Sequence, residues 1–360
     1  MSHSALRHRI VLLLSLGAVA LLVACGHQPG TNTLQPSATS PTATPQPPFD
    51  MADIVQARQL LSEYADQVWP GWGDTLPPFL ICKDDYDYLV GHPNPPEGFA
   101  LLPDVVVAGL PVYRKSGHLV PAPAATTWNV AGVWSVAIPE RVEFQRVIDE
   151  QIGPGIINID RASYVQAIIH EAFHAYQMTR IGGQLPDFGL AVDEQQVLES
   201  LLAVSSLDSQ HAEEGGALLS GLNATTREQA LQAAGEFLRI RGARWAGQPA
   251  DVKAYEQSTE WTEGLARYAE ISFMQRIGQP TESAHLGLTE YPTPDKVWQS
   301  FLQGLSNPSA SPDGFRGRYY LLGAGQAFLL DRLMPEWKQQ VFSEGVSLDG
   351  LLGQAVSQQP

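Results

Sequence analysis

The 360-residue sequence predicts an α+β fold, in which a small sheet precedes a predominantly helical C-terminal half. Between residues 76 and 140, short β-branched and aromatic runs alternate with Pro and Gly, and the run "VWSVAI" at 133–138 is the clearest strand. After residue 163 the apolar residues recur at helical spacing, with Pro and Gly in the gaps. Strands followed by helices, without an internal repeat, indicate an α+β domain.

The first 24 residues predict a signal peptide. Arg7 and Arg9 give a positive start, and a short apolar run ends at "LVAC", residues 22–25. The run is short for a membrane-spanning helix, and the "LVAC" ending followed by glycine resembles a bacterial lipobox. That resemblance implies a lipid on Cys25, and thus an extracytoplasmic protein anchored to the cell membrane or outer membrane. An ordinary signal anchor is the alternative.

The remaining chain divides by composition. Residues 25–48 are rich in Pro, Ser and Thr and predict an extended tether behind the lipidated cysteine. We expect a helix and a small β-sheet subdomain in 49–150 and a helical subdomain in 151–360. The net charge of −16, without a basic cluster, argues against nucleic acid as a partner. If Cys25 is acylated, Cys82 has no disulfide partner, and this cysteine count also argues against a zinc–thiolate site.

Apolar spacing predicts the positions of the helices. An acidic start and helical periodicity place the first helix at 50–69, before the strands. The segments expected to be helical after the sheet are 163–181, 193–206, 225–246, 251–277, 316–334 and 335–343.

The predicted helix 163–181 contains "HEAFH", which is an HExxH motif. Ser163 and Gln166 predict a capping box at its start. His170 and His174 are four residues apart, so both imidazoles can face one metal ion, while Glu171 can reach a water bound to that ion. Two semi-buried helical histidines without a metal are the alternative. The motif predicts a metal site with two nitrogen ligands and a carboxylate base.

A tetrahedral zinc site needs a third protein ligand and an open position. The metzincin pattern is excluded, because Gln177 and Arg180 occupy the positions where that family has glycine and histidine. Two carboxylates remain as candidates. Glu194 lies close to the spacing of thermolysin-like enzymes, and Glu263 lies much further along the chain in "TEGLARYAE", residues 262–270.

The second stretch resembles the "NEGxAxYxE" helix of gluzincin metallopeptidases, in particular the aminopeptidase N type. The resemblance implies that Glu263 is the third zinc ligand and that Glu270 supports a ligating histidine. It also implies that Gly264, which lacks a Cβ, lets this helix pass close to the metal helix. An acidic helix face exposed to solvent is the alternative.

A third stretch, "RYYLLGAGQAFLL" at 318–330, resembles the "Y-x-x-G" helix start of the same family. There a tyrosine donates its hydroxyl to the oxyanion, which implies this role for Tyr320, with Tyr319 as the near alternative. An aromatic pair packed in the core is the non-catalytic interpretation. No "GxMEN" stretch occurs, so the resemblance leaves endopeptidase and exopeptidase activity both open.

Together, the motifs resemble a zincin-like catalytic domain on a bacterial lipoprotein. The implied function is that of a membrane-tethered Zn²⁺ metallopeptidase acting on peptides or proteins, with Glu171 as general base. We expect a monomer whose strand 133–138 forms the sheet edge that pairs with substrate backbone. The alternative is a non-catalytic surface lipoprotein that uses the scaffold for binding or keeps zinc as a structural element.

The lipobox resemblance makes a testable prediction. Cys25→Ala removes the thiol to which the lipid would be attached, so this variant should leave the membrane fraction or remain unprocessed. Fractionation of cells, with mass spectrometry of the mature N-terminus, measures both effects. An unmodified N-terminus in the wild-type protein would contradict the prediction.

Overall fold

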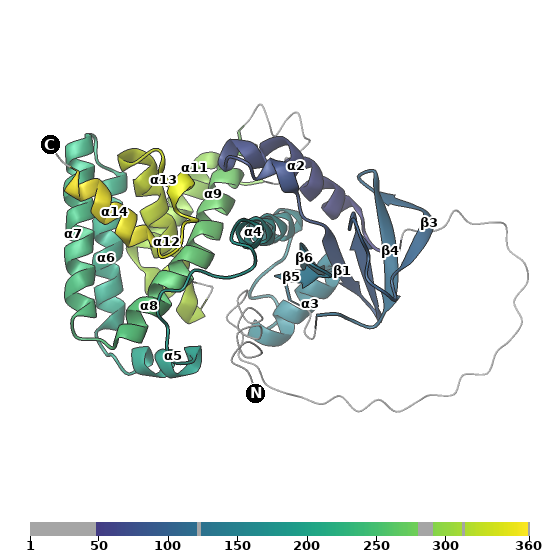
Figure 1. Ribbon diagram of the computed structural model, residues 1–360, viewed down its shortest axis with the longest axis horizontal. Coiled ribbons are helices and arrows are strands. Elements are labelled where there is room, and N and C mark those ends of the chain that lie inside the picture. The colour runs from purple at the N-terminus through teal and green to yellow at the C-terminus, as the bar shows by residue number, and fades with distance from the viewer. Residues whose placement is uncertain (1–47, 121–123, 280–290, 312–313, 359–360) are drawn as a thin grey trace, which may run out of the picture.

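The computed structural model describes residues 48–120, 124–279, 291–311 and 314–358. The expected signal peptide, Cys25 and nearly all of the expected tether lie outside these residues. The α+β fold class is confirmed: a mixed sheet lies at one end of the molecule and a helical half at the other (Figure 1). Helix α4 (Arg161–Arg180) lies between them and packs on both.

Six strands of the described chain form one sheet in the order β3-β4-β2-β1-β6-β5. The strands are β1 (Phe79–Lys83), β2 (Tyr86–Val90), β3 (Ala100–Val107), β4 (Leu110–Ser116), β5 (Thr126–Val130) and β6 (Val133–Pro139). Strands β1 and β6 are parallel, and the other neighbouring pairs are antiparallel. The expectation that 133–138 forms the sheet edge is wrong, because β6 lies between β1 and β5. The edge strand that packs against α4 is β5.

The two faces of the sheet pack against different partners, because side chains alternate along each strand. Phe79 and Ile81 belong to the main core, which also contains residues of α2 (Ala52–Val68) and α4. Leu80 lies on the opposite face, in a smaller cluster that includes Val120. The segment after β4 therefore covers part of the face turned away from α4.

The rest of the described chain is largely helical. Its helices are α3 (Arg141–Ile152), α5 (Glu194–Leu202), α6 (Leu207–Leu222), α7 (Arg227–Trp245), α8 (Ala250–Thr259), α9 (Leu265–Ile277), α11 (Pro294–Ser306), α12 (Gly314–Leu333), α13 (Trp337–Gln340) and α14 (Leu348–Ser357). Short 3₁₀ turns occur at η2 (Gly73–Thr75) and η4 (Pro308–Ala310). Within the described residues, no helix has the length and apolar character needed to cross a bilayer.

Helices α3, α6, α11 and α14 are not predicted by the sequence pattern. In α6 the pair Gly215 and Gly216 has the appearance of a helix break. Gly215 instead allows a close contact between helices, because a Cβ on it would lie 2.1 Å from the carbonyl oxygen of Leu305. Packing against α11 therefore requires a residue without a Cβ at position 215. A contact between helices that are distant in the sequence cannot be predicted from the local sequence pattern.

The start of α4 differs from the predicted capping box. The N-cap residue is Asp160, whose carboxylate accepts a hydrogen bond of 2.8 Å from the backbone N–H of Ser163. The side chain of Gln166 does not turn back to the helix start and instead donates to Glu270. The prediction that Ser163 caps the helix is therefore wrong, because the helix begins about one turn earlier, at Asp160. Gln166 links α4 to α9.

The expected helix 251–277 is interrupted. A π-helical turn, η3 (Glu260–Gly264), separates α8 from α9. A π turn contains one more residue than an α-helical turn, and such turns occur frequently at functional sites. Glu263, the candidate third ligand, lies within this turn.

Helix α12 crosses the η3–α9 segment at two glycines. A Cβ on Gly264 would lie 2.6 Å from the Cα of Gly323, and a Cβ on Gly323 would lie 2.8 Å from the Cα of Gly264. The expectation that Gly264 lets this segment pass close to the metal helix α4 is therefore wrong, because the atoms nearest to Gly264 belong to another helix. The close neighbour is α12, which carries Tyr320 one turn before Gly323.

This crossing makes a prediction about stability. Gly264→Ala should destabilise the protein by about 1–3 kcal/mol, because its methyl group meets backbone atoms that cannot rotate away. Gly242→Ala, at an exposed position of α7 with no atom within 4 Å of the added Cβ, is the matched control. It should raise stability by about 0.5–1 kcal/mol through helix propensity. Denaturant unfolding of both variants measures the difference, and equal effects would contradict the prediction.

Candidate metal centre

His170 and His174 form the first part of the candidate centre. They lie one turn apart on α4, and their Nε2 atoms are 3.1 Å apart. Both residues are buried, with 8% and 7% of their surface exposed. Their rings stand nearly perpendicular, at 82°, so that the two Nε2 atoms converge while the ring planes remain apart.

Glu263 completes a group of three. Its Oε2 atom lies 3.3 Å from Nε2 of His170 and 3.2 Å from Nε2 of His174. These three residues form a buried cluster whose ligand atoms can hold one metal ion. Glu194, the alternative third ligand, is not part of this cluster: its carboxylate accepts a hydrogen bond from Tyr255 and forms an ion pair with Arg316.

The outer nitrogens of the two imidazoles are both occupied. The Nδ1 atom of His170 lies 2.9 Å from Oε2 of Glu270, and this carboxylate accepts a hydrogen bond from it. The Nδ1 atom of His174 lies 2.8 Å from Oε1 of Gln177, whose amide nitrogen donates to the carbonyls of Trp261 and Thr262. With each Nδ1 donating, each neutral ring has its lone pair on Nε2, which is the tautomer a metal requires.

The dimensions of the cluster also fit a metal ion. A tetrahedral ion with bonds of about 2.0–2.1 Å holds its ligand atoms about 3.3 Å apart, close to the separations found here. The second carboxylate oxygen of Glu263, Oε1, is buried without a hydrogen-bond partner among the described residues. Such an oxygen is costly unless a cation is nearby. No fourth His, Cys, Asp or Glu of the described chain joins the cluster, so one coordination position is open.

The electrostatics of the centre favour a positive charge. Burial opposes protonation of His170, but hydrogen bonds to Glu263 and Glu270 outweigh it and raise the pKa of His170 to about 10. Burial likewise opposes ionisation of Glu263, yet the charge of His174 and its hydrogen bonds hold the pKa of that carboxyl well below its usual range. In the metal-free chain a proton supplies the positive charge that a bound cation would provide.

Glu171 lies beside the cluster without belonging to it. Burial raises the pKa of Glu171, against the charges of His174 and His170, which lower it. The hydroxyl of Thr127 on the edge strand β5 is 3.1 Å from Oε2 of Glu171 and 2.7 Å from its backbone oxygen. A carboxylate with a raised pKa beside a cation site has the properties of a general base.

The two tyrosines of α12 point to different surroundings. The ring of Tyr320 lies nearly parallel to that of His170, at 21° with a centroid distance of 6.2 Å. Tyr319 is fully buried on another side of α12 against His211 and Tyr255. The structure therefore brings Tyr320 next to the cluster and places Tyr319 in the core.

A buried ionic network supports the turn that carries Glu263, and the sequence analysis did not identify it. Arg241 binds Glu214 at 2.8 Å and Glu260 at 2.6 Å, and Arg244 binds Glu214 and Glu256 at 2.7 Å. All five side chains are at most 1% exposed. Glu260 is the first residue of the π turn, so this network fixes the turn from the side facing α7. The available signal was charged residues at helical spacing on two successive helices.

Sequence reasoning also missed Gln177 and Thr127, which hold His174 and Glu171 in place. Gln177 lies within the predicted metal helix, three residues after His174, where an amide can reach the ring. Thr127 gave no local signal, because its contact with Glu171 depends on how the sheet packs against α4.

Substitution of the three cluster residues should abolish tight metal binding at this centre. His170→Ala, His174→Ala and Glu263→Ala each remove one of three ligands, so each should lower zinc affinity by at least about 100-fold. Glu194→Ala should leave the affinity unchanged, since this carboxylate lies outside the cluster. Zinc titration against a chromogenic chelator measures all four variants. Equal losses in Glu194→Ala and Glu263→Ala would contradict the prediction.

Comparison of the chain with protein-family models, with curated proteins and with solved structures found no match. The gluzincin resemblance therefore rests on three short motifs, and the functional interpretation rests on the geometry of the site.

Proposed function

We propose that the protein is a zinc-dependent metallopeptidase. The single observation that carries the proposal is the convergence of His170, His174 and Glu263 on one buried point, with one position open and Glu171 beside it. Two neutral imidazoles and a carboxylate are a donor set that suits Zn²⁺ in catalytic sites. A structural zinc would have four protein ligands and no use for a buried base.

In this proposal each side chain has one chemical task. Zinc, when bound, polarises the scissile carbonyl and makes a water molecule acidic. Glu171 accepts a proton from the attacking water and passes it to the leaving amine, and burial raises the pKa of its carboxyl, which makes the carboxylate a stronger base. The hydroxyl of Tyr320 donates to the oxyanion that forms on the carbonyl. Thr127 is a positioning residue, because its hydroxyl proton faces both the backbone oxygen of Glu171, at 2.7 Å, and the Glu171 carboxylate, at 3.1 Å.

The position of β5 at the edge of the sheet supports the proposal that the substrate is a peptide. Its inner side pairs antiparallel with β6, and its outer side ends the sheet beside α4. Backbone N–H and C=O groups at a sheet edge can pair with an extended peptide. We propose that substrate adds to β5, in place of the strand 133–138 that the sequence suggested. The contact between Thr127 and Glu171 places this edge next to the proposed base.

The proposed location follows from the N-terminal sequence alone. The lipobox-like "LVAC" stretch supports a lipid anchor on Cys25, and the Pro-rich residues 26–48 support a tether between membrane and enzyme. We propose a monomer that acts outside the cytoplasm on peptides or proteins near the membrane surface.

The decisive experiment separates the proposed base from the metal ligands. Glu171→Gln keeps the size of the side chain but cannot accept the proton, so peptide hydrolysis should fall by about 10² to 10⁴-fold while zinc stays bound. Digestion of a broad peptide library, with zinc analysis of the same samples, gives both readouts. A wild-type protein that cleaves nothing beyond its chelator-treated form would overturn the peptidase proposal and favour the non-catalytic lipoprotein.

The tyrosines of α12 give a matched pair. Tyr320→Phe should lower hydrolysis by about 10² to 10³-fold if its hydroxyl donates to the oxyanion. Tyr319→Phe removes the same atom from a buried site, where the hydroxyl lies 3.3 Å from Glu256, and should leave hydrolysis unchanged. Steady-state kinetics on a peptide cleaved by the wild type measures both, and an equal loss in the two variants would contradict the assignment.

A further inference from the structure

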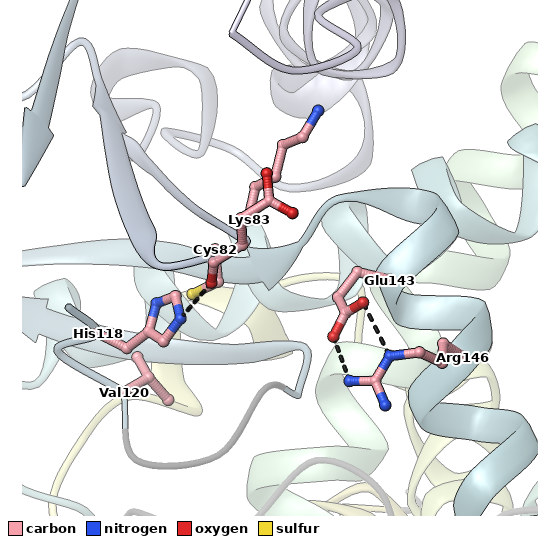
Figure 2. Close-up of a pocket in the computed structure, with 7 residues that line it drawn as sticks. Cys82, Lys83, His118, Val120, Glu143 and Arg146 are labelled. Atoms are coloured by element: carbon pink, nitrogen blue, oxygen red, sulfur yellow. Dashed lines mark hydrogen bonds and ion pairs between the residues drawn. The ribbon is translucent and has the colours of Figure 1, made fainter. Parts of the chain in front are cut away.

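A second group of metal-binding side chains lies on the sheet, away from the centre on α4. Cys82 of β1 and Asp87 of β2 are direct neighbours in the antiparallel register, and His118 follows β4. Their ligand atoms all lie within 4.8 Å of one another. Cys82 and Asp87 are buried, whereas the His118 side chain is 38% exposed. Figure 2 shows the Cys82 sulfur next to the His118 ring.

The hydrogen bonds of this group prepare it for a cation. The Nε2 atom of His118 lies 2.9 Å from the carbonyl oxygen of Asp84, which can only accept a proton, so Nε2 carries one. The Nδ1 atom faces Oδ1 of Asp87 at 2.8 Å. The other oxygen, Oδ2, accepts the backbone N–H of Leu119 at 2.7 Å. A ligating histidine typically donates its second ring N–H to a backbone carbonyl or a carboxylate, as Nε2 of His118 does, and this leaves Nδ1, which is paired with Asp87, as the nitrogen that can bind an ion.

The group also opens onto free space. Cys82, His118 and Val120 line a pocket of about 270 Å³, and Glu143 and Arg146 of α3 form its other side (Figure 2). Three protein ligands with room for a further ligand are typical of an open metal site. Arg146 binds both Glu143 and Glu150 of α3, so the Glu143 carboxylate at the pocket has a partner of opposite charge.

We propose that Cys82, Asp87 and His118 form a second, independent site for a zinc ion, with the open position facing this pocket. Thiolate and imidazole are ligands that favour zinc over magnesium or calcium. Binding displaces the thiol proton of Cys82 and the Nδ1 proton of His118 to solvent, and the metal forms bonds to sulfur and nitrogen in their place. The proposal departs from the expectation, drawn from the cysteine count, that the chain has no zinc–thiolate site, because a site with one thiolate needs only Cys82.

A nucleophilic role fits these residues less well. Burial and the neighbouring Asp87 carboxylate raise the pKa of the Cys82 thiol, so without a cation the sulfur stays protonated at neutral pH. The ring nitrogen of His118 that could act as a base toward other groups, Nε2, is occupied by the Asp84 carbonyl. A bound cation changes this balance, because a coordinating thiol is deprotonated.

Cobalt substitution of the full chain tests the proposal. A thiolate bound to Co²⁺ gives an intense charge-transfer band in the near ultraviolet, whereas a site made only of imidazole and carboxylate gives none. The metal-free protein titrated with Co²⁺ should show this band, and Cys82→Ser should abolish it. His118→Ala should raise the zinc dissociation constant at least about tenfold. Lys83→Ala, which alters the same pocket without removing a ligand, should change neither.

Two further variants separate this site from the rest of the chain. Cys25→Ala should keep the band, because Cys25 is the only other cysteine. His174→Ala should lose the ion bound on α4 and still keep the band, so failure of the proposed peptidase leaves this test intact. A wild-type protein that binds cobalt without the band would overturn the proposal, as would a band that survives Cys82→Ser or disappears in Cys25→Ala or His174→Ala. If Cys82→Ser does not fold, His118→Ala decides the result.

Discussion

The contact between Gly264 and Gly323 is the constraint on which the rest of the candidate centre depends. Helix α12 can approach the η3–α9 segment this closely only because neither residue has a Cβ. The approach fixes two side chains at once. Glu263, directly before Gly264, reaches the histidines of α4, and Tyr320, one turn before Gly323, reaches the ring of His170. A wider spacing between these helices would move the Glu263 carboxylate away from the two histidines and the Tyr320 ring away from His170.

Charge balance is the second organising feature of the helical half. Carboxylates are buried in two places, and each set faces cations of its own. In one place Arg241 and Arg244 bind the three carboxylates of the ionic network, and burial raises the pKa of one of them, Glu260, to about 7. In the other, two imidazoles face Glu263 and Glu270; Arg267 also binds Glu270, and a proton or a metal ion on the imidazoles adds positive charge beside Glu263. Removing one member of such a pair leaves a buried charge without a partner, which typically costs about 3–5 kcal/mol.

Local patterns in the sequence predicted those parts of the structure that short-range geometry determines. The fold class follows from the two kinds of periodicity, and the proximity of His170 and His174 follows from helical spacing. The approach of Glu263 to them is a long-range contact, which only the family resemblance suggested. The interior position of β6 depends on its parallel pairing with β1, and no local pattern shows which strands become neighbours. The ionic network was missed because charged residues on a helix usually face solvent.

The π turn has a consequence for helical phase. In an uninterrupted α-helix, residues 256, 260, 263 and 270 would form one stripe, because they follow the spacing i, i+4, i+7 and i+14. The extra residue of the turn rotates the helix after it by about 100° relative to the helix before it. Glu256 and Glu260 therefore face the arginines of α7, while Glu263 and Glu270 face His170 on α4. One continuous segment thus supplies acidic side chains to two separate sets of cations, and the two sets do not compete for the same carboxylates.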